Sequence, residues 1–85
     1  MKYYLGKIGE RNGDMEYSDK YLFATNGSAA KHADKVAKEW RGCTKGDWDK
    51  DEGGYWSDHT LVFSDDYREI PKEDFDVLKK YLTVL

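Results

Sequence analysis

The stretch KYYLGKIGERNGDMEYSDKYLFAT, residues 2–25, decides the fold. Its two Tyr-rich runs, 2–10 and 15–25, flank Arg11-Asn12-Gly13-Asp14, and Asn-Gly is a strong hairpin signal because both residues tolerate positive φ. In the second run, large apolar side chains fall at even spacing, which predicts a strand with one buried face. These side chains are Met15, Tyr17, Tyr21 and Phe23. We therefore predict an antiparallel hairpin.

Residues 28–41 change to the period of a helix. Asn26 or Ser28 can cap its start, and Gly42 follows its last turn as a helix stop does. The apolar stripe is narrow and mostly alanine, which predicts a helix lying close against a sheet. Its members are Ala29, Ala33, Val36, Ala37 and Trp40.

The second half of the chain begins with a segment, 43–54, that has no period and is predicted to be a loop. Tyr55 and Trp56 open a third strand, and residues 60–63 form a fourth. Asp65-Asp66 is predicted to be a turn, after which residues 67–70 extend the sheet.

A second helix follows, with Pro71 at its first position and Glu73 and Asp74 in its first turn. Its predicted apolar face contains Phe75, Leu78, Tyr81, Leu82 and Leu85. The sequence thus predicts one compact α+β domain over residues 1–85, in the order β-β-α-β-β-α. An antiparallel β-sheet of about four strands would carry two helices packed on one face.

The composition is that of a folded domain with a polar exterior. Aromatic residues make up 15% and charged residues 36% of the chain, with a net charge of −3. No apolar run approaches the ~20 residues that span a bilayer, so no membrane partner is expected. A single cysteine, Cys43, excludes an internal disulfide and favours a cytoplasmic location.

No residue pattern indicates an enzyme or a cofactor. Cys43 has only His32 and His59 as possible bases, and neither spacing is typical of a catalytic family. One cysteine and two distant histidines also supply no zinc ligand set. We therefore expect a non-enzymatic protein with no catalytic residues, no cofactor and no bound metal.

The acidic run beginning at Asp47 has one feature of a calcium loop. Asp49 and Asp51 follow at alternate positions, and Asp58 stands at position 12. Glu52, however, occupies position 6, where such loops require glycine. A solvated acidic loop is the favoured interpretation, and a metal-responsive domain is an alternative hypothesis.

A basic stripe on the first helix suggests a second alternative. Lys31, Lys35 and Lys38 fall on one helical face and can track phosphates, so direct nucleic-acid binding is possible. The net acidic charge opposes this, and lysines commonly cover the solvent face of an amphipathic helix.

Aromatic side chains within the acidic segment provide the main candidate surface. Trp48 is set among carboxylates, and Tyr55 and Trp56 either join it or face the core as strand residues. Exposed aromatics rimmed by charge are typical of a protein-binding hot spot. The predicted partner-binding set is Asp47, Trp48, Asp49, Asp51, Glu52, Tyr55, Trp56 and Asp58.

In overall make-up, a short acidic and aromatic-rich α+β chain without a catalytic motif, the protein resembles phage-encoded anti-CRISPR and other anti-defence inhibitors. This resemblance implies an inhibitor that binds a protein or ribonucleoprotein complex in the host bacterial cytoplasm. Such inhibitors obstruct nucleic-acid entry, and some present carboxylates where phosphates would lie. The resemblance would give that role to the acidic run above, extended by Asp65, Asp66 and Glu69.

Overall fold

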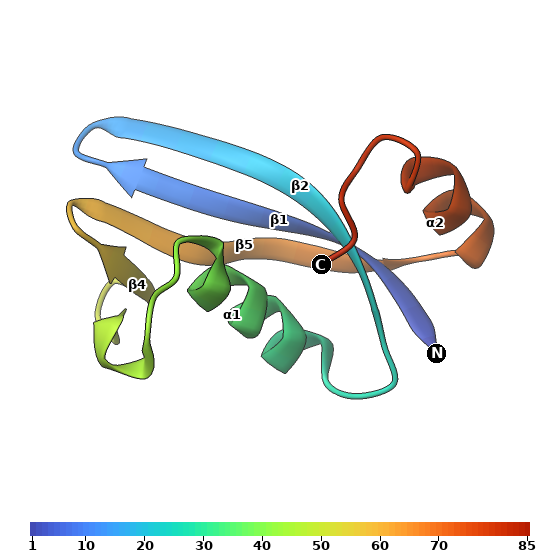
Figure 1. Cartoon of the computed structure of the whole chain (residues 1–85), viewed down its shortest axis with the longest axis horizontal. Coiled ribbons are helices and arrows are strands. Elements are labelled where there is room, and N and C mark those ends of the chain that lie inside the picture. The colour runs from blue at the N-terminus through green and yellow to red at the C-terminus, as the bar shows by residue number, and fades with distance from the viewer.

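The computed structural model describes all 85 residues and confirms the α+β class. Its elements are β1 (Lys2–Asn12), β2 (Met15–Thr25), α1 (Ala29–Trp40), the 3-10 turn η1 (Lys45–Asp47), β3 (Trp48–Asp49), β4 (Gly54–Ser57), β5 (Thr60–Ile70) and α2 (Lys72–Leu78). The strands form one five-stranded antiparallel sheet in the order β2-β1-β5-β4-β3. Figure 1 shows the neighbouring strands β2, β1, β5 and β4 of this sheet. The predicted count of about four strands and the predicted order β-β-α-β-β-α are both wrong, because β3 forms inside the segment predicted as a loop and gives the order β-β-α-β-β-β-α.

The N-terminal hairpin is confirmed, but its turn differs from the prediction. Asn12 pairs with Met15, so the connection is the two residues Gly13-Asp14. Only Gly13 has a positive φ, of 60°, whereas the prediction placed Asn12 in that region as well. Glycine at the first of two turn positions suits a type II′ turn, whose twist matches that of the strands.

The strand β5 runs without a break through the predicted Asp65-Asp66 turn. Lys7 of β1 pairs with Asp66 and Ile8 with Ser64, so Asp65 is an extra residue in the ladder. Such a β-bulge twists a strand and does not end it. Two consecutive aspartates therefore mark an irregularity within one strand here, not a reversal of the chain.

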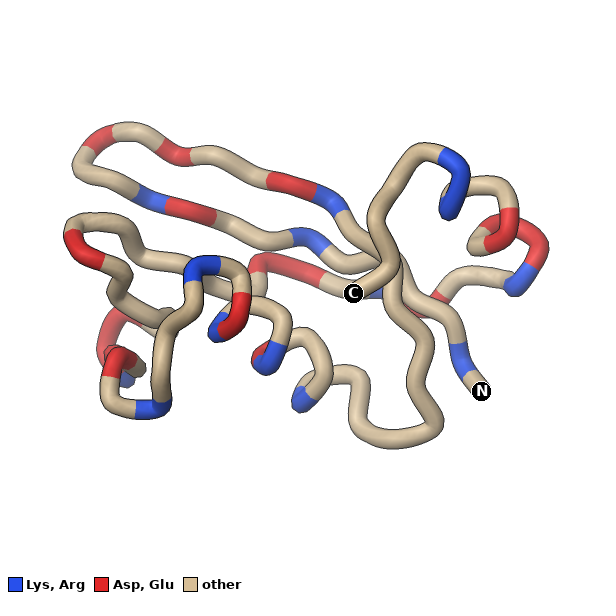
Figure 2. Tube along the Cα trace, in the orientation of Figure 1, with Lys and Arg blue, Asp and Glu red and all other residues tan.

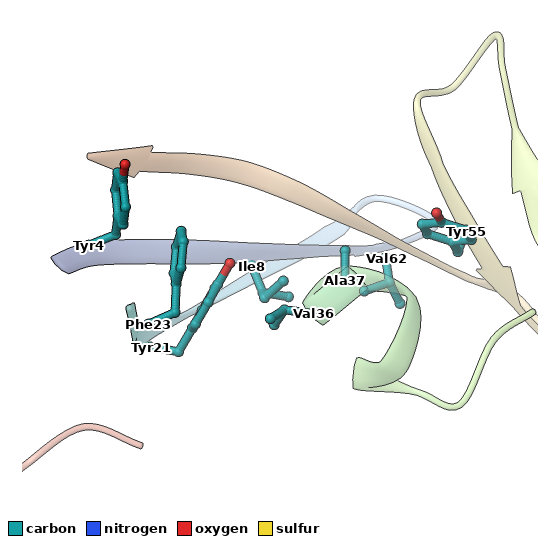
Figure 3. Packing of buried hydrophobic residues seen from close by; sticks show 8 residues of the cluster. All are labelled: Tyr4, Ile8, Tyr21, Phe23, Val36, Ala37, Tyr55 and Val62. Carbon is teal, nitrogen blue, oxygen red and sulfur yellow. The ribbon is translucent and has the colours of Figure 1, made fainter. Parts of the chain in front are cut away.

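The helix α1 packs on one face of the sheet and forms the main core with it (Figure 3). The Ser28 hydroxyl accepts a hydrogen bond from the Lys31 amide at 3.2 Å, as predicted for a cap, and Gly42 follows the helix with a φ of 69°. Ala33, Val36 and Ala37 are buried. The strands contribute Tyr4, Ile8, Tyr21, Phe23, Tyr55 and Val62 to this core.

The helix α2 covers the opposite face, so the prediction that both helices share one face is wrong. Successive strand residues point to opposite faces, and Tyr4 points toward α1. Its neighbour Tyr3 instead contacts Phe75 of α2, with ring centroids 4.9 Å apart. Leu5 and Ile70 also lie on this second face, beside Leu78.

The predicted second helix is too long, because α2 ends at Leu78. Tyr81 is 79% exposed and does not contribute to an apolar helix face. The following residues instead pair with the edge of β2. The Leu22 amide donates to the Thr83 carbonyl at 2.9 Å, and the Leu85 amide donates to the Leu22 carbonyl at 2.8 Å.

The outer half of β2 extends beyond the core. Met15 and Tyr17 were predicted to be buried, but they are 59% and 52% exposed. All residues from 15 to 20 are exposed, while Tyr21 and Phe23 are buried. The sequence period placed these side chains on one face correctly, but no element covers the end of that face.

Neither helix is long and apolar enough to cross a membrane.

Candidate functional site

The predicted partner-binding residues lie mainly at the β3 edge of the sheet, and the strand geometry divides them between its two faces. Trp48 pairs with Tyr55, and Asp49 pairs with Gly54. Because side chains alternate along a strand, Trp48 and Tyr55 share the α1 face, whereas Asp49 and Trp56 share the other. We call β3, β4 and the turn between them, residues 48–57, the Trp48 edge.

On the α1 face, a buried tyrosine supports an exposed tryptophan. The Tyr55 hydroxyl donates to the Asp34 carboxylate of α1, 2.8 Å from Oδ2. The Trp48 ring packs edge-on against Tyr55, with centroids 5.0 Å apart, yet its side chain remains 46% exposed. A shallow cleft of about 600 Å³ lies here, lined also by Lys45 and Gly46. Tyr55 therefore fixes the position of Trp48 without covering it.

On the other face, Asp49 organises the turn of the Trp48 edge. Its Oδ2 accepts from the Trp56 indole nitrogen at 2.9 Å, and its Oδ1 accepts from the amides of Asp51 and Glu52. The hydrogen bond from the indole and those from the turn amides lower the pKa of Asp49. Trp56 remains 38% exposed. Asp49 is thus committed to internal contacts.

The other carboxylates of the predicted partner-binding set differ in whether they bond to other groups of the chain. Asp47 caps η1 by accepting from the Thr44 amide at 2.8 Å, and Glu52 pairs with Arg11 of β1. Asp51, at the tip of the turn, and Asp58, in the turn between β4 and β5, are exposed and form no salt bridge. They therefore lie at opposite ends of β4, and the acidic bands around this strand are separate in space (Figure 2).

The carboxylates of the calcium-like run do not converge. Asp47 and Asp49 serve different backbone amides, and no group of three or more His, Cys, Asp or Glu side chains is arranged to hold a metal ion. The spacing that resembled a calcium loop instead produces a 3-10 turn and a four-residue connection between β3 and β4, in which the Gly53 amide donates to the Asp49 carbonyl at 2.8 Å.

The cysteine and the two histidines make different contacts, and no hydrogen bond joins them. Cys43 Sγ is 3.7 Å from the Trp56 carbonyl oxygen, and burial, together with nearby Asp47, raises the pKa of its thiol. His32 stacks on Phe23 with centroids 4.5 Å apart. His59 is exposed in the β4–β5 turn. The raised thiol pKa disfavours the thiolate that nucleophilic chemistry uses.

The predicted basic stripe lies on the outer face of α1. Lys31 and Lys35 are exposed, Lys38 is half-buried, and none of the three forms a salt bridge. Asp34, which interrupts the stripe in the sequence, turns aside toward Tyr55. The three ammonium groups are therefore available to a ligand. Lysines on the solvent face of a helix are, however, equally common without one.

The sequence did not single out Glu10, a carboxylate with only 8% exposure on β1, which lies between β2 and β5. It accepts a hydrogen bond from the Trp40 indole nitrogen at 3.0 Å and forms an ion pair with Arg41. These bonds hold the end of α1 against the sheet. Glu10 lies at even spacing from Tyr4 and Ile8, and this period marked it as facing the core.

No protein-family model, no curated protein and no solved structure matches this chain.

Proposed function

We propose that this protein is a non-enzymatic binding protein that inhibits a larger nucleic-acid-handling complex by docking the Trp48 edge on it. The observation that carries the proposal is the 46% exposure of Trp48 on the last strand of the sheet. Trp56 is 38% exposed on the other face of the same edge. An edge with a tryptophan on each face suits insertion into a cleft of the partner.

The exposed indole is a source of binding energy. Tryptophan is enriched among interface hot spots, because one side chain contributes a large rigid apolar area. Covering the exposed half of Trp48 would contribute about 2–3 kcal/mol before the costs of association. Its ring is already held by Tyr55 at 5.0 Å, so less side-chain freedom is lost on binding.

The charge around the edge favours a basic partner. Residues 47–58 contain five carboxylates and only one basic side chain, Lys50. Asp51 and Asp58 have no salt bridge within the chain, so their charge is available to steer association. Surfaces that bind nucleic acid are basic, and carboxylates presented there would compete with phosphates. This complementarity supports a protein or ribonucleoprotein as the partner.

The proposal is tested by affinity capture from a bacterial lysate, with mass spectrometry of the bound proteins. We expect subunits of a nucleic-acid-handling complex, and we expect double-stranded DNA to displace them. Trp48→Ala and Asp51→Lys should each reduce capture at least about tenfold, since a hot-spot truncation costs about 2 kcal/mol or more. Circular dichroism should be unchanged, because both side chains are exposed.

Matched controls lie at the far end of the molecule. Tyr81→Ala removes an aromatic side chain that is 79% exposed, and Glu73→Lys reverses an exposed charge in α2. Both should leave capture intact. Equal capture by all four variants, or capture that DNA does not displace, would rule out the Trp48 edge as the inhibitory surface.

A second candidate function is nucleic-acid binding by α1, which the freedom of Lys31, Lys35 and Lys38 from salt bridges favours. It places the ligand on α1 and not on the Trp48 edge, and it predicts that the chain binds bare nucleic acid.

A further inference from the structure

The cleft beside Trp48 contains a carboxylate that the fold uses on one side only. Asp34 of α1 lines this cleft, is exposed and forms no salt bridge. Both of its oxygens accept from a single donor, the Tyr55 hydroxyl, at 2.9 and 2.8 Å. A carboxylate has about four acceptor positions, so some remain open on each oxygen. The cleft therefore contains an anionic acceptor that the chain does not neutralise.

An aromatic surface lies close to this carboxylate. Tyr55, only 5% exposed, contacts both groups, because its ring packs against the Trp48 ring at 5.0 Å and its hydroxyl reaches Asp34. Trp48 and Asp34 line the same cleft of about 600 Å³, together with Gly46, which adds no side chain to its wall. A half-exposed indole and an unneutralised carboxylate are thus held within reach of one long side chain.

We propose that this cleft receives an arginine side chain of the partner, an assignment that rests on the proposed function because it names what the Trp48 edge would bind. A planar guanidinium stacks on the face of an indole and donates its remaining N–H groups to a carboxylate. The aliphatic part of the same side chain packs on the exposed part of Trp48. An apolar side chain would leave the charge of Asp34 without a partner, and an anionic one would be repelled by it.

Arginine suits this cleft better than lysine does. Its guanidinium is less strongly hydrated than an ammonium, so it loses less on leaving water to lie against the Trp48 ring. An ammonium pairs equally well with the Asp34 carboxylate but has no planar face to place on the indole. Several N–H donors in one plane also allow the group to bond Asp34 from the side that the Tyr55 hydroxyl leaves open.

Lys45 is the one basic residue that lines the cleft, and it opposes an incoming cation. The residue is exposed and its ammonium group forms no salt bridge, so this flexible side chain can turn to solvent. Asp34 and Lys45 therefore act on the same ligand with opposite sign. Removing the charge of Asp34 should weaken arginine binding, and removing that of Lys45 should strengthen it.

Heteronuclear NMR spectroscopy of the isotope-labelled chain, titrated with N-acetyl-arginine amide, tests the cleft without the partner. The Trp48 indole and the Gly46 amide should shift and saturate. N-acetyl-lysine amide should bind at least about threefold more weakly, and the uncharged isostere N-acetyl-citrulline amide should not saturate these signals. All titrations are held at one ionic strength, because exposed charges are screened by salt.

Variants of the two charged lining residues complete the test. Asp34→Asn keeps an oxygen for the Tyr55 hydroxyl and should weaken binding of the arginine probe about fivefold. Lys45→Met has a similar length without the charge and should tighten binding about twofold. Glu39→Gln is the matched control, because it removes an exposed carboxylate of the same helix that does not line this cleft. It should bind the probe as the wild type does.

Equal affinity for the arginine and citrulline probes would overturn the assignment of arginine to this cleft. So would shifts that are not centred on Trp48 and Gly46, or an Asp34→Asn variant that binds like the wild type. Partner capture that Trp48→Ala abolishes would still support the proposed function in each of these cases. Conversely, a probe that binds as expected in a chain that captures no nucleic-acid-handling complex would support the arginine site and contradict the inhibitory function.

Discussion

The hydroxyl of Tyr55 donates a hydrogen bond to the carboxylate of Asp34, 2.8 Å from Oδ2, and thereby joins the short strand β4 to α1. β4 has only four residues and pairs on its outer side with the two-residue strand β3. Backbone pairing alone gives such a short edge little stability. The tether between Tyr55 and Asp34 therefore positions the tryptophan proposed to bind the partner.

Tyr55→Phe should destabilise the domain by about 1–2 kcal/mol in urea unfolding, because it removes a hydrogen bond to a charged acceptor. The ring and its packing against Trp48 would remain. Asp34→Asn keeps an acceptor oxygen and should cost less. If Tyr55→Phe leaves the unfolding midpoint unchanged, the hydrogen bond contributes no stability and Tyr55 acts through packing alone.

The domain should lose stability at alkaline pH through two buried tyrosines. Burial raises the pKa of Tyr21 to about 12, and burial together with the Asp34 hydrogen bond raises the pKa of Tyr55 to about 12. Their reference pKa is about 10, so the folded state retains protons that the unfolded state releases. The stabilising contribution is present below pH 10 and is lost as pH rises toward 12.

Urea unfolding at several pH values across this window measures the loss, and tyrosinate absorbance reports the ionisation. Tyr55→Phe should make the decline shallower without abolishing it, because Tyr21 still titrates. The Tyr21 hydroxyl is buried without a hydrogen-bond partner in the protein, so its shift comes from burial. A constant free energy of unfolding from pH 10 to 12 would contradict both shifts.

Two glycine substitutions in β1 should destabilise the domain to different extents. A Cβ on Gly6 would overlap the ring of Tyr21, and a Cβ on Gly9 would overlap the ring of Phe63. Tyr21 is only 1% exposed and cannot move aside, whereas Phe63 is half-buried and can swing toward solvent. Gly6→Ala should therefore cost about 2–3 kcal/mol and Gly9→Ala about 1 kcal/mol.

A double-mutant cycle separates these overlaps from general strand effects. Phe63→Ala removes the ring opposite Gly9, so Gly9→Ala in that background should cost much less than in the wild type. Equal costs at Gly6 and Gly9, or no coupling between Gly9 and Phe63, would show that the ring overlaps do not determine the loss.

The elements with strong local signals were predictable from the sequence. Ser28 and Gly42 delimit α1 as expected, and the alternation of Tyr21 and Phe23 identifies the face of β2 that meets it. The errors come from long-range effects. Asp65-Asp66 has turn composition, but pairing with β1 keeps it in the strand as a bulge. Which face of the sheet α2 covers depends on the direction that the chain takes after β5. The period of the apolar residues does not indicate that direction.

In the candidate site, too, local features were predictable from the sequence and long-range contacts were not. The sequence correctly indicated that Trp48 is exposed. It did not indicate that Asp47 and Asp49 serve as internal hydrogen-bond acceptors, because their partners are backbone amides and an indole placed by two turns. Glu10 was missed because an acidic residue in a strand is ordinarily exposed, and its burial depends on Trp40 and Arg41, some 30 residues away.

The two candidate functions differ in what they predict for bare nucleic acid. Inhibition through the Trp48 edge requires no contact with phosphates, so we expect no retarded band in a low-salt gel shift with double-stranded DNA. The domain has a net charge of −3, which opposes association with a polyanion. A band that fades steeply with added salt and is lost in Lys31→Glu/Lys35→Glu would instead assign phosphate binding to α1, since each neutralised phosphate contributes to the salt slope. The control is Lys80→Glu, an exposed lysine beyond α2, which should leave any such band unchanged.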